Sequence, residues 1–288
     1  MNHTAPQSIL LVCKGKSTAA TETAEHIRTW LTARGVSVRT ISTMEDRAKI
    51  RAAAKGQDAA LVLGGDGAML GVARALIGLD VPLLGINFGR VGFLTEIPAQ
   101  AWEPMLQALL NGEFFLQKHL ALNWRLTSTL SAERNGWVVN DVVIARGTAA
   151  RAISLDLSVD DIHLSSLRCD GVIVSAPLGA TAYAASAKGP LAFPSLECQL
   201  VTPISPFAGA FPPLVLPAAS RINLSHNEPE QDVRLNLDGQ DVLAIQPGDC
   251  LEIYGVPNMV HLLVHDPKWY LRRLVERGFI LTGPGLYA

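Results

Sequence analysis

A glycine-rich segment with a single carboxylate is the part of the sequence best suited to chemistry. The motif G-G-D-G at residues 64–67 follows an apolar run at 58–63 and precedes a segment with helical spacing at 68–77. Glycine lets the backbone approach a ligand closely, and a helix N-terminus attracts anions. The carboxylate of Asp66 repels a phosphate that is merely held, but it suits accepting a hydroxyl proton or holding Mg²⁺ beside a phosphate. The motif therefore favours phosphoryl transfer, with a phosphate loop made by Gly64, Gly65 and Gly67.

The glycine-rich loop matches neither of two common phosphate-binding motifs. A Walker A loop ends in Lys followed by Ser or Thr, and no such pair is present after the glycines. The dinucleotide fingerprint G-x-G-x-x-G also fails, because Gly71 comes one residue too late. A tight strand-to-helix turn with Asp66 as a cap accounts for the same residues equally well, so the loop by itself leaves both interpretations open.

A second candidate site lies in residues 169–183. An apolar strand at 171–176 leads through a Pro-Gly turn into a short helix of small residues that starts at Thr181. Backbone N–H groups, the hydroxyls of Thr181 and Ser186, and the ring of Tyr183 then lie at one edge, where a ligand has room. Close packing of a short helix on a sheet also favours small residues, and from spacing alone it is the better interpretation.

Asn140 and Asp141 are a third candidate, because they interrupt the apolar segment 137–145, which predicts a strand. A buried polar group without a partner costs about 1–3 kcal/mol, so these side chains need partners. A ribose diol is one candidate partner, and a hydrogen bond within a β-bulge or hairpin is another.

The elements that must position these residues change in kind along the chain. Up to about residue 113, strands and helices alternate, which predicts a parallel sheet covered by helices on both faces. The predicted strands are 8–13, 36–41, 58–63 and 81–86, and the predicted helices are 18–33, 44–55, 68–77 and 98–110, the last with a kink at Pro104.

Short strands dominate the rest of the chain and predict a second, β-rich domain. The domains expected are 1–115, completed by a C-terminal segment at about 262–288, and 116–261. Prolines between Pro203 and Pro217 predict a loop with edge-strand pieces, and 267–277 predicts a helix that folds back on the first domain. The predicted strands are 119–127, 137–145, 152–159, 171–176, 221–224, 233–237 and 251–254.

Composition excludes several functional classes. The 288 residues are 49% hydrophobic and carry a formal charge of −2, which argues against disorder and against a general nucleic-acid binder. The four cysteines form no C-x-x-C pair, so we expect free thiols in a reducing cytosol. His261 and His265 flank an apolar strand and lie too far apart to share a metal ion, so no metal site is expected. With no apolar run of about 18 residues and no signal peptide, we expect a cytoplasmic protein without a membrane span.

Taken together, the motifs resemble the NAD kinase family. They occur in the family's order, over residues from about 58 to 240, and include the run D-G-x-I-x-S-x-P-x-G-x-T-A-Y. Related sugar and lipid kinases share the G-G-D-G loop but lack the Thr-Ala-Tyr run. The matching segments are G-G-D-G at 64–67, L-G-I-N at 84–87, G-R-V-G-F-L-T at 89–95, N-D at 140–141, the long run at 170–183 and D-G-Q at 238–240.

The resemblance implies an α/β domain followed by a β-rich domain, with the ligand cleft between them. It implies that ATP with Mg²⁺, or polyphosphate, phosphorylates the 2′-hydroxyl of the adenosine ribose of NAD, with Asp66 as the base. It also implies a homodimer or homotetramer. The further substrate-binding residues it implies are Gly67, Phe93, Asn140, Asp141, Arg151, Arg168, Asp170, Thr181, Ala182, Tyr183, Ser186 and Gln240.

The chain departs from the family pattern beside the expected phosphate path. Ala68 replaces the usual Thr or Asn, and three hydroxyls are lost at Ala176, Leu178 and Ala180. Each lost hydroxyl removes about 0.5–1.5 kcal/mol of hydrogen bonding. Two alternatives follow: an NAD- or NADP-binding paralogue with weak catalysis, and a related G-G-D-G kinase of lipids or sugars.

Overall fold

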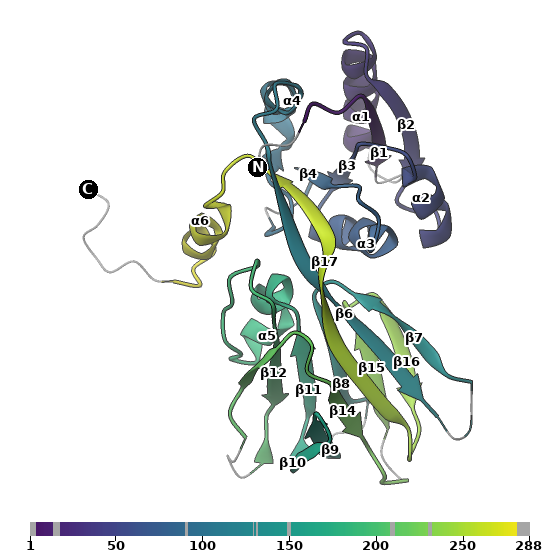
Figure 1. Ribbon diagram of the computed structural model, residues 1–288, viewed down its shortest axis with the longest axis vertical. Helices are drawn as coiled ribbons and strands as arrows, with labels where there is room; N and C mark the ends of the chain where they lie inside the picture. Colours follow the sequence, from purple (N-terminus) through teal and green to yellow (C-terminus); the bar gives the residue numbers. More distant parts are fainter. Residues whose placement is uncertain are drawn as a thin grey trace, which may run out of the picture. The chain divides into compact units, whose positions relative to one another are not determined.

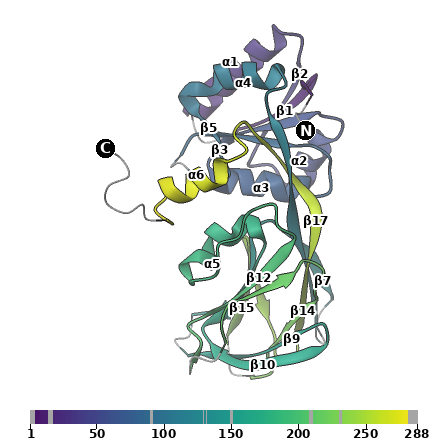
Figure 2. The same ribbon diagram turned by 60° about the vertical axis from the view of Figure 1, so that its left-hand side comes forward.

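The computed structural model describes residues 4–13, 18–89, 92–128, 130, 132–148, 151–207, 211–229 and 232–280. The chain divides into two compact units. Unit 1 comprises residues 1–117 and 261–288, and unit 2 comprises residues 118–260. Figures 1 and 2 show the elements of each unit, and the chain passes between the units along two long strands, β6 and β17.

Unit 1 is built on a parallel sheet with strand order β2-β1-β3-β4, which confirms the predicted fold class. The final part of β17 joins it beside β4, with Leu262 opposite Leu83. Strands β1 and β3 are continuous apolar runs, as expected for strands covered on both faces. The strands are β1 (Ser8–Cys13), β2 (Ser37–Ser42), β3 (Ala59–Gly64), β4 (Leu83–Asn87), β5 (Ile97–Pro98) and β17 (Cys250–Val264).

Helices cover both faces of this sheet. Figure 2 shows α1 and α4 on one face, where they share an apolar core with the strands, and α3 on the other face. The C-terminal helix α6 also belongs to unit 1, where Trp269 and Tyr270 are buried. The helices are α1 (Thr18–Thr32), α2 (Arg47–Ala54), α3 (Asp66–Leu76), the 3₁₀ turn η1 (Ala99–Ala101), α4 (Trp102–Leu110) and α6 (Trp269–Glu276).

Two helix boundaries differ from the predictions for local reasons. Helix α2 begins three residues later than expected, because the Asp46 side chain caps it by accepting a hydrogen bond from Lys49 N. Helix α3 begins two residues earlier, with Gly65 as its N-cap, so Asp66 is its first residue. Pro104 lies in the first turn of α4, where its missing N–H removes no hydrogen bond within the helix, so the physical reason for the expected kink does not apply at this position.

Unit 2 consists of two sheets that enclose one apolar core. One has the antiparallel order β13-β12-β11-β8-β15-β16, and the other joins β10, β9, β14 and β17 with β6 and β7. The strands of unit 2 besides β17 are β6 (Phe115–Thr127), β7 (Arg134–Val138), β8 (Asp141–Arg146), β9 (Ile153–Val159), β10 (Ile162–Cys169), β11 (Gly171–Ser175), β12 (Cys198–Ile204), β13 (Leu214–Pro217), β14 (Ile222–Ser225), β15 (Val233–Leu237) and β16 (Asp241–Ile245).

The expected single strand at 137–145 is wrong, because the chain breaks there into β7 and β8. Strands β10, β12 and β16 were not predicted, and β17 is much longer than the expected 251–254. In the proline-rich segment, β13 is an edge strand, as predicted for proline, and residues 208–210 lie outside the described residues. The small residues after β11 form the 3₁₀ turn η2 (Pro177–Thr181) and the short helix α5 (Tyr183–Ser186).

Candidate functional site

The carboxylate of Asp66 is held by backbone amides of a neighbouring loop in unit 1. Its Oδ2 accepts a hydrogen bond from Phe93 N at 2.6 Å. Its Oδ1 accepts from Leu94 N at 3.0 Å and Thr95 N at 3.3 Å, and the Thr95 hydroxyl lies 3.4 Å away. The alternative in which Asp66 merely caps its own helix is wrong, because the N-cap is Gly65 and has no side-chain hydrogen bond.

The two oxygens of Asp66 are not equally occupied. A carboxylate offers about four acceptor positions, two on each oxygen. Both positions of Oδ1 are taken, one by Leu94 N and one shared by the amide and the hydroxyl of Thr95, whereas Oδ2 takes only Phe93 N among the donors of the described residues. Oδ2 of Asp66 therefore has capacity for one more donor, such as a hydroxyl group.

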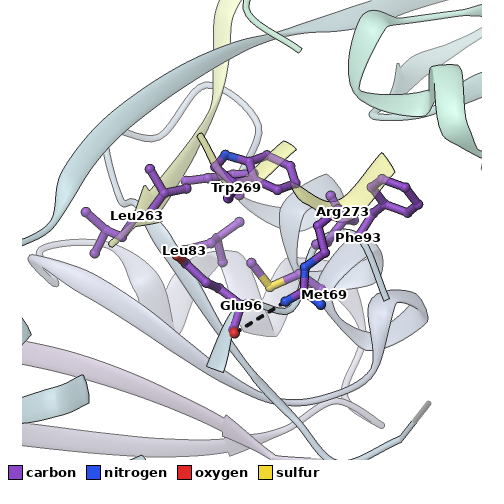
Figure 3. A pocket seen from close by; sticks show the side chains of 10 residues that line it. Met69, Leu83, Phe93, Glu96, Leu263, Trp269 and Arg273 are labelled. Atoms are coloured by element: carbon purple, nitrogen blue, oxygen red, sulfur yellow. Dashed lines mark hydrogen bonds between the residues drawn. The ribbon is translucent and has the colours of Figure 1, made fainter. Parts of the chain in front are cut away.

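Phe93 and the C-terminal segment form one aromatic cluster beside this loop. The Phe93 ring lies 6.3 Å from the Tyr270 ring and 5.4 Å, edge to face, from the Phe279 ring. Figure 3 shows Phe93 next to Arg273, with Trp269 on the same helix. The position of Phe93 therefore depends on residues more than 170 positions away, which no local sequence pattern indicates.

Glu96 and Arg273 tie the same loop to the C-terminal segment. The Glu96 carboxylate accepts hydrogen bonds from His265 N at 3.0 Å and Asp266 N at 3.2 Å. The Arg273 guanidinium donates to the carbonyl oxygen of Thr95, at 3.3 Å, and to that of Glu96, at 3.5 Å; Figure 3 marks the bond to Glu96. Burial is the main reason that the pKa of Glu96 rises to about 7. Neither Glu96 nor Arg273 was predicted from the sequence.

A cavity of about 580 Å³ opens beside these residues in unit 1. Its wall includes Asn87 and Gly89 at the end of β4, Glu96, and Arg272 and Arg273 of α6. A β-carbon on Gly89 would lie 3.9 Å from Gly65 Cα, so the cavity adjoins the G-G-D-G loop. The wall carries charges of both signs, because Arg272 pairs with Asp266 and Arg273 with Glu276, and both carboxylates line the same cavity.

In unit 2, four of the predicted site residues share one cavity of about 250 Å³. They come from separate places in the sequence: the start of β8 and the turn between η2 and α5. Asp238, which was part of a matching motif but had no predicted role, lies in the same wall. The lining residues are Asn140, Asp141, Val143, Ala182, Tyr183, Asn236, Asp238 and Gly239.

Asp238 explains the break between β7 and β8. Its buried carboxylate accepts hydrogen bonds from the backbone N–H groups of Val139 at 2.9 Å, Asn140 at 2.7 Å and Asp141 at 3.1 Å. Because these N–H groups bind a side chain and not a neighbouring strand, the backbone hydrogen bonding of the strand is interrupted between β7 and β8. The Asn140 carbonyl accepts from Ala176 N at 2.8 Å, which fixes the backbone of Asn140 from both sides.

The side chains of Asn140 and Asp141 have unmet hydrogen-bonding capacity. Oδ1 of Asn140 is buried and has no hydrogen-bond partner among the described residues. An orphaned buried acceptor is costly, so it points to a ligand that brings a donor. Asp141 is buried, and its burial, together with the negative charge of Asp238, raises the pKa of its carboxyl to about 7. Both properties suit recognition of hydroxyl groups.

The structure does not gather the other predicted residues around this cavity. Asp170 forms an ion pair with Arg146 at 2.8 Å, and the exposed Arg168 guanidinium lies 5.7 Å from the Phe207 ring. Thr181 ends η2, next to the cavity residue Ala182. The exposed residues outside its wall are Arg151, Ser186 and Gln240.

The departures near η2 fall at buried positions. Ala176, Leu178 and Ala180 are all buried, and Ala180 packs against Ala192, Cys198 and Leu200. A hydroxyl at Ala180 would need a partner inside an apolar cluster. The loss of a hydroxyl at Ala180 thus agrees with its present surroundings.

Two further properties concern the described residues alone. Within them, no group of three or more His, Cys, Asp or Glu side chains is arranged to hold a metal ion. None of the helices in that part of the chain is long and apolar enough to cross a membrane.

The four cysteines are free, as predicted, and burial raises the pKa of the Cys169 thiol to about 11.

Solved structures first define the class of fold. The crystal structure of yeast NADH kinase complexed with NADH matches 98% of this chain and 90% of its own, with a TM-score of 0.82 and 20% identity. An NAD kinase from Archaeoglobus fulgidus, in complex with ATP, matches 92% of this chain and 96% of its own, with a TM-score of 0.72 and 24% identity. The fold is therefore that of these kinases.

Sequence comparison then identifies the family. Residues 40–114 match the model of the ATP-NAD kinase N-terminal domain, and residues 139–264 match that of the C-terminal domain. The NAD kinase of Nitratidesulfovibrio vulgaris (Miyazaki F) is 44% identical over 96% of this chain and 98% of its own length. That of Oleidesulfovibrio alaskensis is 37% identical over 96% of this chain and 95% of its own length. The chain belongs to the NAD kinase family.

Proposed function

We propose that Asp66 is the general base of an NAD kinase reaction in which NAD is phosphorylated to NADP. Family membership carries the overall reaction. The observation that supports the assignment of the base is the open acceptor position on Asp66 Oδ2. The acceptor hydroxyl is the 2′-hydroxyl of the adenosine ribose, and the phosphoryl donor is ATP or polyphosphate.

In the proposed step, Oδ2 of Asp66 takes the proton of the 2′-hydroxyl while the 2′-oxygen of the ribose attacks the terminal phosphorus of the donor. The bond from phosphorus to the bridging oxygen breaks, and its electron pair leaves with ADP or with the shortened polyphosphate. Asp66 then releases its proton to solvent. The glycines Gly64, Gly65 and Gly67 leave room for the phosphates beside the start of α3.

NAD is held in unit 2 by the cavity that contains Asn140 and Asp141. The orphaned Oδ1 of Asn140 accepts a hydrogen bond from a ribose hydroxyl, and the Asp141 carboxylate accepts another. Tyr183, which is exposed, offers a ring for stacking. Further contacts of NAD are assigned to Phe93, Arg151, Arg168, Asp170, Thr181, Ala182, Ser186 and Gln240.

Mg²⁺ is expected to arrive with the donor. It prefers phosphate oxygens and a few carboxylates to a cage made only of protein groups. Held by the phosphate oxygens of the donor, Mg²⁺ would neutralise charge there, while the open position of Asp66 Oδ2 stays with the substrate hydroxyl. We further propose that the chain acts in the cytoplasm. We also propose that it forms a homodimer or homotetramer, and light scattering would measure the mass of that oligomer.

The test is NADP formation by the purified protein with NAD, Mg²⁺ and either ATP or polyphosphate. Asp66→Asn should reduce turnover by at least about 10²-fold, because a general base contributes 10²–10⁴-fold, and should leave NAD binding by calorimetry largely unchanged. Asp80→Asn makes the same chemical change at a side chain that is 99% exposed, and should behave as wild type. Normal turnover by Asp66→Asn would show that the base is another group.

Two further outcomes correspond to the alternative functions. NAD binding without NADP formation by the unaltered protein would indicate a weakly catalytic paralogue, and the lost hydroxyls at Ala176, Leu178 and Ala180 would become its cause to test. Phosphorylation of a lipid or sugar instead of NAD would indicate a related G-G-D-G kinase. The paired Asn140 and Asp141 favour the nucleotide substrate.

A further inference from the structure

Gly92 lies where any side chain would collide with the Asp66 carboxylate. A β-carbon built on Gly92 would be 1.9 Å from Oδ1, 2.0 Å from Cγ and 2.1 Å from Oδ2 of Asp66. Non-bonded carbon and oxygen atoms do not approach so closely, so a side chain at Gly92 and this position of Asp66 exclude each other. The absence of a side chain at Gly92 is thus a condition for the observed carboxylate contacts.

The kind of atom that a new methyl group meets decides what moves. At Gly92 the neighbours are the terminal atoms of one side chain, which can rotate away. At Gly85 a β-carbon would instead meet Thr95 Cα at 3.0 Å, and at Gly179 it would meet the Asn140 carbonyl oxygen at 2.3 Å. Substitution of Gly92 therefore displaces Asp66 selectively, whereas substitution of the other two displaces backbone.

We propose that Gly92 is a positioning residue for phosphoryl transfer. Its bare backbone lets the Asp66 carboxylate settle against the amides of Phe93, Leu94 and Thr95, with one acceptor position of Oδ2 left for the hydroxyl of the substrate. The inference rests on the proposed role of Asp66 as the base. It adds that the loop after β4 sets the direction in which that base acts.

The loop itself is also held by contacts with the C-terminal segment. Arg273 of α6 donates to the carbonyl oxygens of Thr95 and Glu96, and the Glu96 carboxylate binds the amides of His265 and Asp266. Thr95 is buried. A braced loop presents its amides in fixed directions, and a catalytic group held in one orientation avoids the rate loss that misplacement causes.

The first experiment compares kcat and KM of Gly92→Ala with those of the unaltered enzyme. We expect kcat to fall by about 10- to 100-fold, because a displacement near 1 Å can cost about 10²-fold. KM for NAD should change by a smaller factor than kcat, since the NAD-binding residues of unit 2 are untouched and Phe93 is the one assigned NAD contact next to the substitution. Gly136→Ala is the control, because the atoms nearest its β-carbon would be those of the Trp124 side chain in unit 2, at 3.1 Å. Its kcat should equal that of the unaltered enzyme.

A double-mutant cycle separates positioning from a merely structural role. If Gly92 acts through Asp66, adding Gly92→Ala to Asp66→Asn should cause no further loss of kcat. Thermal unfolding gives a readout that is independent of activity: Asp66→Ala, placed in the Gly92→Ala chain, removes the colliding carboxylate and should restore part of any lost stability. An undiminished kcat in Gly92→Ala would overturn the proposal.

A structural role would look different. Gly92→Ala would then lower kcat by the same factor in the Asp66→Asn background, or its loss of stability would persist after Asp66→Ala, and either result would also overturn the proposal. Failure of the proposed function is distinguishable, because Asp66→Asn alone would keep its turnover whatever Gly92→Ala does.

Discussion

Replacement of Asp238 by Ala should destabilise unit 2 strongly, because one carboxylate serves three backbone donors. Its oxygens accept from Val139 N, Asn140 N and Asp141 N at 2.9, 2.7 and 3.1 Å. Each donor left unsatisfied in a buried place costs about 1–3 kcal/mol, which gives about 3–9 kcal/mol for the three. The adjoining cavity of about 250 Å³ admits water to the freed N–H groups. We therefore expect the low end, about 3 kcal/mol.

Asp238→Asn should cost less, because it keeps one oxygen. In the structure Oδ1 accepts from both Asn140 N and Asp141 N, and Oδ2 accepts from Val139 N. An amide nitrogen at the Oδ2 position would face that N–H as a second donor, so one bond of three is lost. We expect a loss of about 1–2 kcal/mol.

Urea unfolding monitored by fluorescence and circular dichroism measures these losses. Asp161→Asn is a matched control, because Asp161 is exposed, lies in a turn with φ of 66°, and Asn tolerates that conformation. It should change the free energy of unfolding by less than about 0.5 kcal/mol. An unfolding free energy for Asp238→Ala within about 1 kcal/mol of the unaltered protein would refute the view that this carboxylate satisfies three buried donors.

Two further predictions concern titration and the C-terminal segment. The pKa values of Glu96 and Asp141 are both raised to about 7, from ordinary values of 4.5 and 3.8, so the stability they contribute is complete below those ordinary values and is lost as pH rises through about 7. Unfolding free energy measured between pH 5 and 8 should fall, and Glu96→Gln or Asp141→Asn should flatten the fall; an unchanged slope in both would contradict the assignment. Phe279→Ala removes the edge-to-face contact with Phe93, so we expect a loss of about 0.5–1.5 kcal/mol and a raised KM for NAD. Calorimetry and initial rates measure these effects, and an unchanged KM would separate Phe93 from NAD binding.

The spacing of apolar residues predicted helices and strands well where the element buries one face or both faces. In α1 the spacing of Ala20, Ala24, Ile27 and Leu31 predicted a helix, and these four residues are its buried ones. The continuous run in β3 likewise predicted a buried strand. Such patterns succeed because burial repeats with the period of the element itself.

The predictions failed where a distant side chain overrides the local pattern. Residues 137–145 have the pattern of one apolar strand, yet the Asp238 carboxylate, about a hundred positions later in the chain, takes the amides at the break. Turn chemistry at Asp238-Gly239 was visible, but nothing in the sequence shows which amides a turn carboxylate will reach. The sequence offered one signal of this contact, namely the family resemblance, in which the N-D motif occurs together with the later D-G-Q motif. Two motifs are expected to occur together when their residues line the same cavity.

The glycine that Asp66 requires lies outside its own motif. The glycines beside Asp66 predict a phosphate loop, yet a β-carbon on Gly65 or Gly67 would come within 4 Å of no atom of the described residues beyond its own neighbours in the chain and the adjoining helix backbone. The position that must lack a side chain is Gly92, on the next loop of the sheet, because parallel strands β3 and β4 bring their carboxyl ends to one edge. Parallel pairing predicts that these two loops meet at one edge of the sheet. A contact of this kind can therefore be sought in a sequence as a carboxylate after one strand and a glycine after the next.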